Sequence, residues 1–381
     1  MSINELQDDL AKQLQSLKEQ QQYRTLKIAT GIDFSSNDYL GLSQDDDFLN
    51  FVRLAIAENE RSLAAPAARL LSGTTKLHVE LEQQLATFKG TEKALLLPSG
   101  YQANMALLTS LVRPHDRVLS DEQNHASLID AIRLTGCKKL IYPHLDTRAL
   151  KNSLEQPYHD GRTFMVTESL FSMDGDMADL AMYADLAARH GAYLIVDDAH
   201  STGVYGATRG SGLLEHFQIE NRVTAVVFTL GKALGFSGGC IGASNTVIDY
   251  VINCARPFIF TTAQPPLLLI AIQCALEWTQ KYPELRARVL FLADLFRKRM
   301  KHAGINTLQS CGPIVPVVVS TNERALHLAN VLQEQGFDAR AIRPPTVAEN
   351  SSRVRICIHA NHTEKNLEQL AHVIINTVKS L

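Results

Sequence analysis

The chain has 381 residues, of which 45% are apolar and 20% are charged, a balance typical of a globular protein with a full hydrophobic core. Its formal net charge of −3 gives no electrostatic reason to expect binding to nucleic acid or to an anionic membrane. The six cysteines are scattered without a Cys-x-x-Cys pair, which argues against a disulfide framework and a zinc site and favours a reducing cytoplasm.

The first twenty residues predict an amphipathic helix, which we interpret as part of an N-terminal arm over residues 1–45. Its apolar residues recur at helical spacing: Ile3, Leu6, Leu10, Leu14 and Leu17. The charged residues among them are not typical of a signal peptide. The longest uncharged apolar stretch, Leu267 to Leu276, is shorter than the ~20 residues of a membrane helix. We therefore expect a soluble protein that is not exported.

Residues 93–243 alternate short apolar runs with helical patterns. The predicted strands are 94–97, 117–119, 140–142, 163–166, 193–196 and 223–228, with helices from about 102, 125, 147 and 179. Gly191 is a plausible C-terminal cap for the last of these helices. Strands that alternate with helices imply a parallel sheet covered on both faces, in which ligands gather at the carboxyl ends of the strands.

After Pro265-Pro266 the pattern changes to long helices and then to a smaller α+β unit. Its predicted strands are 314–319, 339–342 and 353–358, and a helix ends the chain. The spacing of Ser320 and Glu323 predicts a capping box at a helix start. We therefore predict a large α/β domain over residues 46–284 and a small α+β domain over residues 285–381.

A turn of small residues, Ser99-Gly100-Tyr101, separates the predicted strand 94–97 from the helix that follows. Free backbone N–H groups and the helix dipole make such a helix N-terminus a ready phosphate site. The turn lacks the Gly-Lys-Ser/Thr of a Walker A sequence, and an ordinary helix start is the alternative reading.

An acidic sequence, Asp197-Asp198, follows a buried run at the expected carboxyl edge of the sheet, and His200 comes soon after it. Burial of a carboxylate costs free energy unless a cationic group stabilises it. Two alternatives are a pair of helix-capping carboxylates and a metal site with His200, although no third ligand stands at metal spacing.

Lys232 stands among small residues in Leu230-Gly231-Lys232-Ala233-Leu234-Gly235, directly after the strand 223–228. A lysine that must bind a carbonyl carbon, leave and return needs such freedom, and partial burial lowers its pKa. The alternative is a solvated surface lysine.

A phosphate cradle, an acid and a mobile lysine on one edge of a sheet are what pyridoxal phosphate requires. The lysine binds the cofactor covalently, and the acid pairs with the ring nitrogen. His125, in Asn124-His125-Ala126-Ser127 at a predicted helix start, is a candidate to lie flat on the ring. A capped or solvated imidazole is the alternative for His125 taken alone.

The ordered motifs resemble the α-oxoamine synthases over nearly the whole chain. These motifs are Ser36–Gly41, Leu71–Thr74 with His78, Asn124–Ser127, Thr167–Asp176, Asp197–His200, the Lys232 stretch and Ile342–Val347. The resemblance implies a fold-type I pyridoxal phosphate transferase, with a mostly parallel central sheet sandwiched by helices. It also implies a decarboxylative condensation of an amino acid with an acyl thioester.

The resemblance assigns roles to individual residues. Lys232 would hold the cofactor, Asp197 would pair with the pyridinium nitrogen, His200 would contact the phenolic oxygen and His125 would stack on the ring. Backbone at Gly100 and Tyr101 and the Thr229 hydroxyl would hold the phosphate, with Ser172 beside the ring. Arg343 would bind the amino-acid carboxylate, Asn37 belongs to the substrate-binding motif, and Arg24 is a candidate for a further carboxylate-binding arginine.

The family works as a homodimer, and Thr262 matches a position that reaches the partner subunit's phosphate. The stretch Ile342–Val347 is most similar to the biotin-pathway member, which joins L-alanine to a pimeloyl thioester delivered on coenzyme A or acyl carrier protein. Alternatives are a glycine acetyltransferase of threonine breakdown and a non-catalytic pyridoxal-phosphate-binding protein. The chain departs from the family's glycine-rich run at Ala64–Ala68, and it has Ala348 and Asn350 where the family tends to have proline and then glycine.

Overall fold

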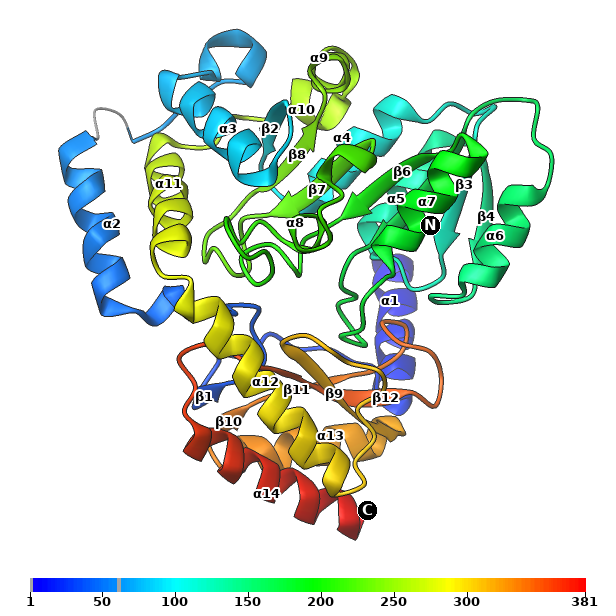
Figure 1. Cartoon of the computed structure of the whole chain (residues 1–381). Helices are drawn as coiled ribbons and strands as arrows, with labels where there is room; N and C mark the ends of the chain where they lie inside the picture. The colour runs from blue at the N-terminus through cyan, green and yellow to red at the C-terminus, as the bar shows by residue number, and fades with distance from the viewer. Residues whose placement is uncertain (1–2, 60–62) are drawn as a thin grey trace. The chain divides into compact units, whose positions relative to one another are not determined.

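The computed structural model describes residues 3–59 and 63–381 (Figure 1). The helices are α1 (Ile3–Glu19), α2 (Asp46–Asn59), α3 (Lys76–Lys89), α4 (Gly100–Leu111), α5 (Ala126–Thr135), α6 (Thr147–Glu155), α7 (Leu180–His190), α8 (Leu213–Phe217), α9 (Asn245–Cys254), α10 (Arg256–Ile259), α11 (Pro266–Lys281), α12 (Glu284–His302), α13 (Asn322–Glu334) and α14 (Glu364–Ser380). The strands are β1 (Ile32–Asp33), β2 (Lys93–Leu97), β3 (Arg117–Asp121), β4 (Lys138–Tyr142), β5 (Thr163–Glu168), β6 (Tyr193–Asp197), β7 (Ala225–Thr229), β8 (Gly239–Ala243), β9 (Ile314–Ser320), β10 (Phe337–Asp338), β11 (Arg340–Ile342) and β12 (Ser352–Cys357).

The central sheet has seven strands in the order β2-β8-β7-β6-β5-β3-β4. Strands β4, β3, β5, β6 and β7 pair in parallel, which confirms the mostly parallel sheet predicted from the sequence. Strand β8 pairs antiparallel with both β7 and β2. The carboxyl ends of β5, β6 and β7 therefore meet at one edge, where the candidate site lies.

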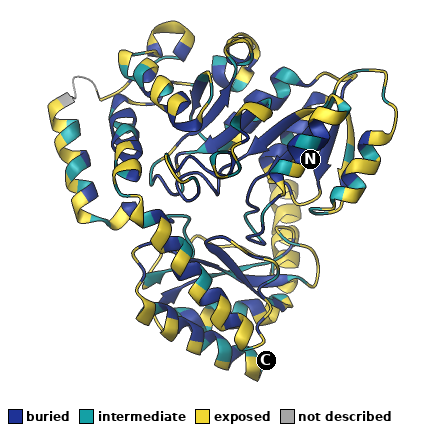
Figure 2. Ribbon diagram, in the orientation of Figure 1, coloured by how far each residue is buried: buried dark blue, intermediate teal, exposed yellow. Residues whose placement is uncertain are grey.

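Most of the strands of this sheet are buried, as the dark blue ribbon of Figure 2 shows. Successive side chains of a strand point to opposite faces, so each face collects alternate residues. On one face, Leu95, Val166, Ile195 and Val227 belong to a buried cluster with residues of α4, α5, α9 and α10. Burial of about 25 cal/mol per Å² of apolar surface makes such a cluster a main source of stability.

Local sequence explains where several helices begin and end. Helix α7 ends at Gly191, which has a left-handed φ of 60° and caps the helix as predicted. The capping box predicted from Ser320 and Glu323 is wrong. Helix α13 begins one residue later, because the side chain of Thr321 accepts a hydrogen bond from the backbone N–H of Arg324.

The chain divides into two compact units. The smaller unit contains the residues up to Ser36, Met173–Gly175 and Phe291–Leu381, and the larger unit contains Asn37–Ser172 and Asp176–Leu290. The smaller unit holds the antiparallel sheet β11-β12-β9, the parallel pair β1 and β10, and helices α13 and α14. The domain limits at residues 45 and 284 stay predictions.

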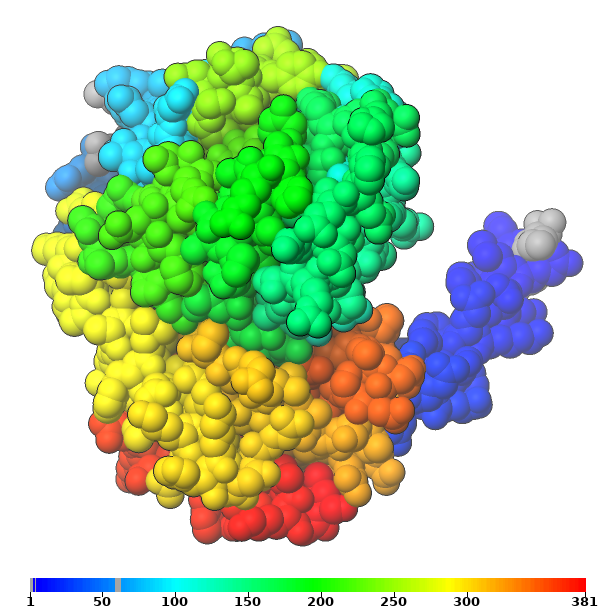
Figure 3. All heavy atoms as spheres, turned by 45° about the vertical axis from the view of Figure 1, so that its right-hand side comes forward, coloured from blue at the N-terminus to red at the C-terminus, as the bar shows by residue number. Residues whose placement is uncertain are grey.

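The predicted N-terminal helix is confirmed as α1, and its apolar side chains are exposed, from 79% for Ile3 to 38% for Leu17. Figure 3 shows this helix, in blue, projecting from the orange residues of the same unit. None of the helices in residues 3–59 and 63–381 has the length and apolar character that crossing a lipid bilayer requires.

Candidate active site

The candidate site lies at the carboxyl ends of three neighbouring strands. Glu168 ends β5, Asp197 ends β6 and Thr229 ends β7. Glu168 pairs in register with Asp197. Glu168 comes two residues after Val166, and Asp197 comes two residues after Ile195, and both apolar residues belong to the buried cluster. All three side chains therefore share the sheet face that packs against α4 and α5.

A chain of hydrogen bonds joins Asp197 to His125. The Asn104 side chain of α4 donates its Nδ2 hydrogens to Asp197 Oδ2 at 2.7 Å and to Ser127 Oγ at 2.9 Å. Ser127 Oγ lies 2.7 Å from Nδ1 of His125, and the backbone N–H of Ala199 donates to Asp197 Oδ1 at 3.0 Å. Two donors therefore stabilise the ionised form of the Asp197 carboxylate.

His125 caps α5, and the backbone N–H of Ser127 donates to its Nδ1 at 3.2 Å. Burial lowers the pKa of His125, Asp197 raises it and Lys232 lowers it. The net pKa is below that of an ordinary histidine, because a buried imidazolium loses hydration. A neutral ring with an apolar face suits stacking on a flat aromatic group.

Lys232 is half-buried in the turn between β7 and β8, and its Nζ lies 2.9 Å from Nε2 of His200. The other ring nitrogen of His200 lies 2.7 Å from the hydroxyl of Tyr39, which donates to Asn37 Oδ1 at 3.1 Å. His200 thus bridges the Tyr39 hydroxyl at Nδ1 and the Lys232 amine at Nε2. The lysine amine is therefore held at the edge of the sheet by a buried histidine.

The phosphate cradle predicted at Ser99-Gly100-Tyr101 lies at the N-terminus of α4, which begins at Gly100 rather than near residue 102. The Ser99 side chain caps the helix by accepting from the backbone N–H of Gln102 at 3.2 Å. A Cβ added to Gly100 would stand 2.4 Å from Cγ2 of Thr229, so only glycine fits between α4 and the end of β7. The first N–H groups of α4 and the Thr229 side chain thus border one another.

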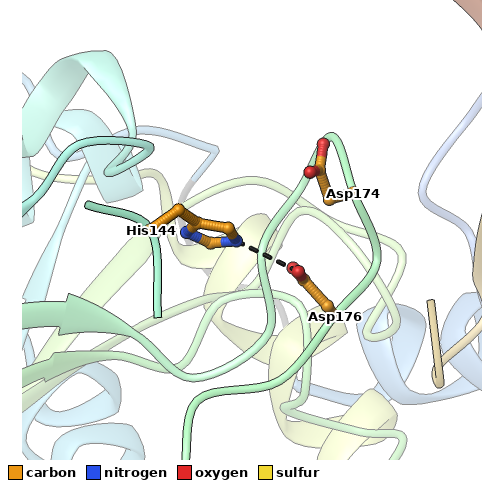
Figure 4. Close-up of side chains that lie close together, drawn as sticks. All are labelled: His144, Asp174 and Asp176. Atoms are coloured by element: carbon orange, nitrogen blue, oxygen red, sulfur yellow. Dashed lines mark hydrogen bonds and ion pairs between the residues drawn. The ribbon is translucent and has the colours of Figure 1, made fainter. Parts of the chain in front are cut away.

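Ser172 lies half-buried in the turn that follows β5. The base of this turn is held by His144, whose Nδ1 lies 2.8 Å from a carboxylate oxygen of Asp121. Its Nε2 lies 3.0 Å from a carboxylate oxygen of Asp176 (Figure 4). Burial of the ring opposes protonation, but hydrogen bonds with Asp121 and Asp176 raise the pKa of His144 to about 10. Asp174, at the tip of the turn, is counted with the smaller unit, where it pairs with Arg353.

Three predicted residues are not joined to the Lys232 cluster by the contacts described above. Thr262 is exposed and forms an antiparallel bridge with Ala68. Arg343 and Arg24 belong to the smaller unit, where Arg24 Nη2 donates to Thr346 Oγ1 at 3.2 Å. Burial lowers the pKa of Arg343, and the nearby charge of Arg24 adds to that effect.

The departures from the family's glycines carry little backbone strain. None of Ala64–Ala68 has a positive φ, so alanine costs nothing there in backbone conformation. Asn350 has a φ of 60°, a left-handed conformation that asparagine tolerates better than most residues other than glycine. Asparagine therefore meets the backbone requirement at that position.

Sequence reasoning assigned no role to several residues of the site. These residues are Tyr39, Asn104, Ser127 and Glu168. Tyr39, Ser127 and Glu168 lie inside motifs quoted above, but none of these motifs states which neighbour the side chain meets. Asn104 lies within α4, where its helical position gave no signal of a polar contact across 93 residues of sequence.

The family model described as aminotransferase class I and II matches residues 29–374. An 8-amino-7-oxononanoate synthase of Geobacter sulfurreducens is 40% identical over 389 residues, which cover 98% of each chain. An 8-amino-7-oxononanoate synthase of Stutzerimonas stutzeri is 42% identical over 342 residues, covering 90% of this chain and 86% of that protein.

Two solved structures resemble the whole fold. A serine palmitoyltransferase of S. paucimobilis with bound pyridoxal phosphate and myriocin has a TM-score of 0.90 and 25% identity, covering 100% of this chain and 99% of that one. An 8-amino-7-oxononanoate synthase of Francisella tularensis has a TM-score of 0.78 and 28% identity, covering 92% of this chain and 98% of that one. The fold-type I architecture expected from the resemblance is confirmed.

Proposed function

The chain belongs to the aminotransferase class I and II family and, within it, to the 8-amino-7-oxononanoate synthases, and from this premise we propose that it joins L-alanine to a pimeloyl thioester. The products are 8-amino-7-oxononanoate, carbon dioxide and the free thiol, a step of biotin biosynthesis. The chain is an acyltransferase that depends on pyridoxal phosphate.

The residues at the edge of the sheet fit this cofactor. Lys232 offers an amine, Asp197 a hydrogen-bonded carboxylate and His125 a ring whose pKa burial lowers, and a Cβ on Gly100 would crowd the Thr229 side chain beside the start of α4. When bound, pyridoxal phosphate supplies an electron sink that stabilises negative charge on the α-carbon of the amino acid. Each proposed holding group is thus present with the required chemistry.

The observation that carries the proposal is the contact between Lys232 and His200 on the same edge as Asp197. The amine of Lys232 would take the proton from the α-carbon of alanine as a general base. His200 accepts a hydrogen bond from that amine and orients it. Asp197 would hold the ring nitrogen, where its negative charge would favour a bound proton.

Substrate binding is assigned to Arg343 and Arg24, with Asn37 holding Tyr39 and through it His200. A guanidinium binds a carboxylate through two parallel hydrogen bonds, which suits Arg343 for alanine. Arg24 lines a cavity of about 830 Å³ in the smaller unit, together with apolar side chains of Leu14, Leu17 and Val347. That combination supports a ligand with a methylene chain and a distant carboxylate, as pimelate has.

A homodimer is also part of the proposal. Large apolar side chains are exposed beside the bridge between Ala68 and Thr262: Leu70 at 51%, Leu71 at 82% and Phe260 at 71%. Exposed apolar groups gathered in this way are typical of a protein–protein interface. A second copy seated there would bring Thr262 to the partner's phosphate, as the resemblance implies. The cytoplasmic location inferred from the cysteines stays a prediction.

The function is tested by kcat/KM values for alanine and glycine, each with pimeloyl-CoA and acetyl-CoA. We expect alanine with pimeloyl-CoA to be the preferred pair, and the methyl group of alanine to be worth about tenfold or more over glycine. Glycine with acetyl-CoA as the better pair would indicate the acetyltransferase instead. Cofactor binding without exchange of the α-proton of any amino acid with solvent would indicate a non-catalytic protein.

A further inference from the structure

Glu168 is a buried acid at the candidate site to which no role has been assigned. It is the last residue of β5, it is 3% exposed, and it lies in register beside Asp197 of β6. Both side chains point to the sheet face that carries α4 and α5. Two buried carboxyl groups therefore share one face of adjacent strands.

The hydrogen bonds of the two acids differ. Asp197 accepts from the Asn104 side chain and from the backbone N–H of Ala199. The Glu168 carboxyl group accepts from the backbone N–H of His125, and its Oε1 has no hydrogen-bond partner among the described residues. A negative charge is consequently better stabilised on Asp197 than on Glu168.

The charges around Glu168 act in the same direction. Burial raises the pKa of Glu168 well above its usual value, and the neighbouring charge of Asp197 raises it further. Lys232 and the backbone N–H of His125 lower the pKa of Glu168, and Asp121 raises it, with a net shift upward. When two carboxyl groups lie side by side in one site, one is charged and the other keeps its proton, because charging both costs free energy.

We propose that Glu168 is a positioning residue that holds a proton on its carboxyl group, so that the negative charge of the site stays on Asp197. Glu168 also anchors the start of α5 through the His125 backbone N–H, and so sets the height of the His125 ring over the site. The proposal rests on the proposed function only for the identity of the cofactor that Asp197 and His125 face.

Infrared spectroscopy on the cofactor-loaded protein tests the protonation directly. At neutral pH the wild type should show the carbonyl band of a buried carboxylic acid, and the Glu168→Gln variant should lack it. Glu215→Gln is the matched control: burial raises the pKa of Glu215, but hydrogen bonds from Arg209, Ser211 and Thr208 lower it overall, so this variant should keep the band. The proposal is overturned if the wild type shows no carbonyl band, or only a band that is still present in Glu168→Gln.

A second measurement follows the absorbance of the bound cofactor as a function of pH. Glu168→Gln is neutral like the proposed acid, so its titration midpoint should match the wild type. Glu168→Ala removes the anchor of His125, and we expect the cofactor dissociation constant to rise about two- to twelve-fold, the effect of one hydrogen bond. A midpoint shift of about one pH unit or more in Glu168→Gln would mean that Glu168 carries a charge, and would overturn the proposal.

The two proposals fail separately. A protein that binds the cofactor and shows the acid band but turns over no substrate would overturn the proposed function and leave the state of Glu168 intact. A protein that binds the cofactor and turns over substrate without the band would overturn only the inference about Glu168.

Discussion

Lys89 and Asp198 form an ion pair in which Nζ lies 2.6 Å from Oδ2 and neither side chain is exposed. The same amine donates to Thr202 Oγ1 at 2.9 Å and to the backbone oxygen of Ser211, and it lies 4.9 Å from the centre of the Phe228 ring. Asp197 and Asp198 are consecutive, but only Asp197 joins the candidate site. The buried pair thus anchors, through Asp198, the turn that also carries Asp197 and His200.

Lys89→Met should destabilise the protein by about 3–5 kcal/mol, because it leaves the Asp198 carboxylate buried without a countercharge. The double variant Lys89→Met/Asp198→Asn should recover part of that loss, since no unpaired charge remains. Denaturant unfolding of the wild type, both single variants and the double variant measures these differences. Independent, additive losses would contradict the pairing.

Borohydride reduction of the cofactor-loaded protein should fix the cofactor to Lys232. This lysine is half-buried at the edge of the sheet and contacts His200 at 2.9 Å. Peptide mass spectrometry after reduction locates the label. A label on Lys89 or another lysine would remove Lys232 from its proposed role, and Lys232→Ala should give no label at all.

Asp197→Asn should lower kcat/KM at least ten- to a hundred-fold. The change replaces a charge-assisted hydrogen bond with a neutral one, a loss of about 1.5–3 kcal/mol before the lost ring protonation is counted. Steady-state kinetics and the cofactor spectrum measure the effect. Turnover near the wild-type value would mean that Asp197 does not pair with the ring, and His200 would be the next residue to change.

The stabilisation that His144 gives the folded protein should decrease as the pH rises from about 6.5 towards 10. The folded-state pKa of about 10 lies above the ordinary value of 6.5, so the folded protein binds more protons over this range. The contribution is complete below pH 6.5 and is lost as the pH passes the folded-state pKa, at up to about 1.4 kcal/mol per pH unit. Unfolding midpoints across this range should fall less steeply in His144→Gln, whereas His302→Gln, at an exposed position of α12, should match the wild type.

Leu71→Asp should weaken the proposed dimer. Burial of a leucine contributes about 1.5–3 kcal/mol, so the dissociation constant of the dimer should rise about tenfold to a hundredfold. Light scattering or sedimentation at several concentrations measures it. The control is Leu134→Asp, which changes a leucine of α5 that is 67% exposed and outside the apolar group around the bridge. Equal effects of both substitutions would contradict this interface.

Much of the large unit could be predicted from local sequence. Strands β2, β3, β4, β5, β6 and β7 lie within about two residues of the runs predicted for them, because short apolar segments between helical patterns need few long-range contacts to be recognised. Helices α2, α3, α8, α9 and α10 and strand β8 were not predicted. Strand β8 begins at Gly239 and contains a second glycine at Gly242, which weakens a strand pattern, and it forms because β2 and β7 pair with it on both sides.

The sequence by itself determined which chemical groups are available and near which strand ends they stand. The lysine after β7, the acids after β6 and the small-residue turn before α4 were all evident, because each depends on residues close together in the chain. Their combination predicted a pyridoxal phosphate site, and the resemblance assigned their individual roles, which stay predictions.

Only the tertiary structure decided which polar groups face one another. Glu168 lies beside Asp197 because β5 and β6 pair in that register, and a shift of one residue would send either side chain to the other face. The contacts of His200 with Tyr39 and of Asp198 with Lys89 span 161 and 109 residues of sequence. Such contacts depend on strand order, register and packing together, and these are properties of the folded chain that no local pattern contains.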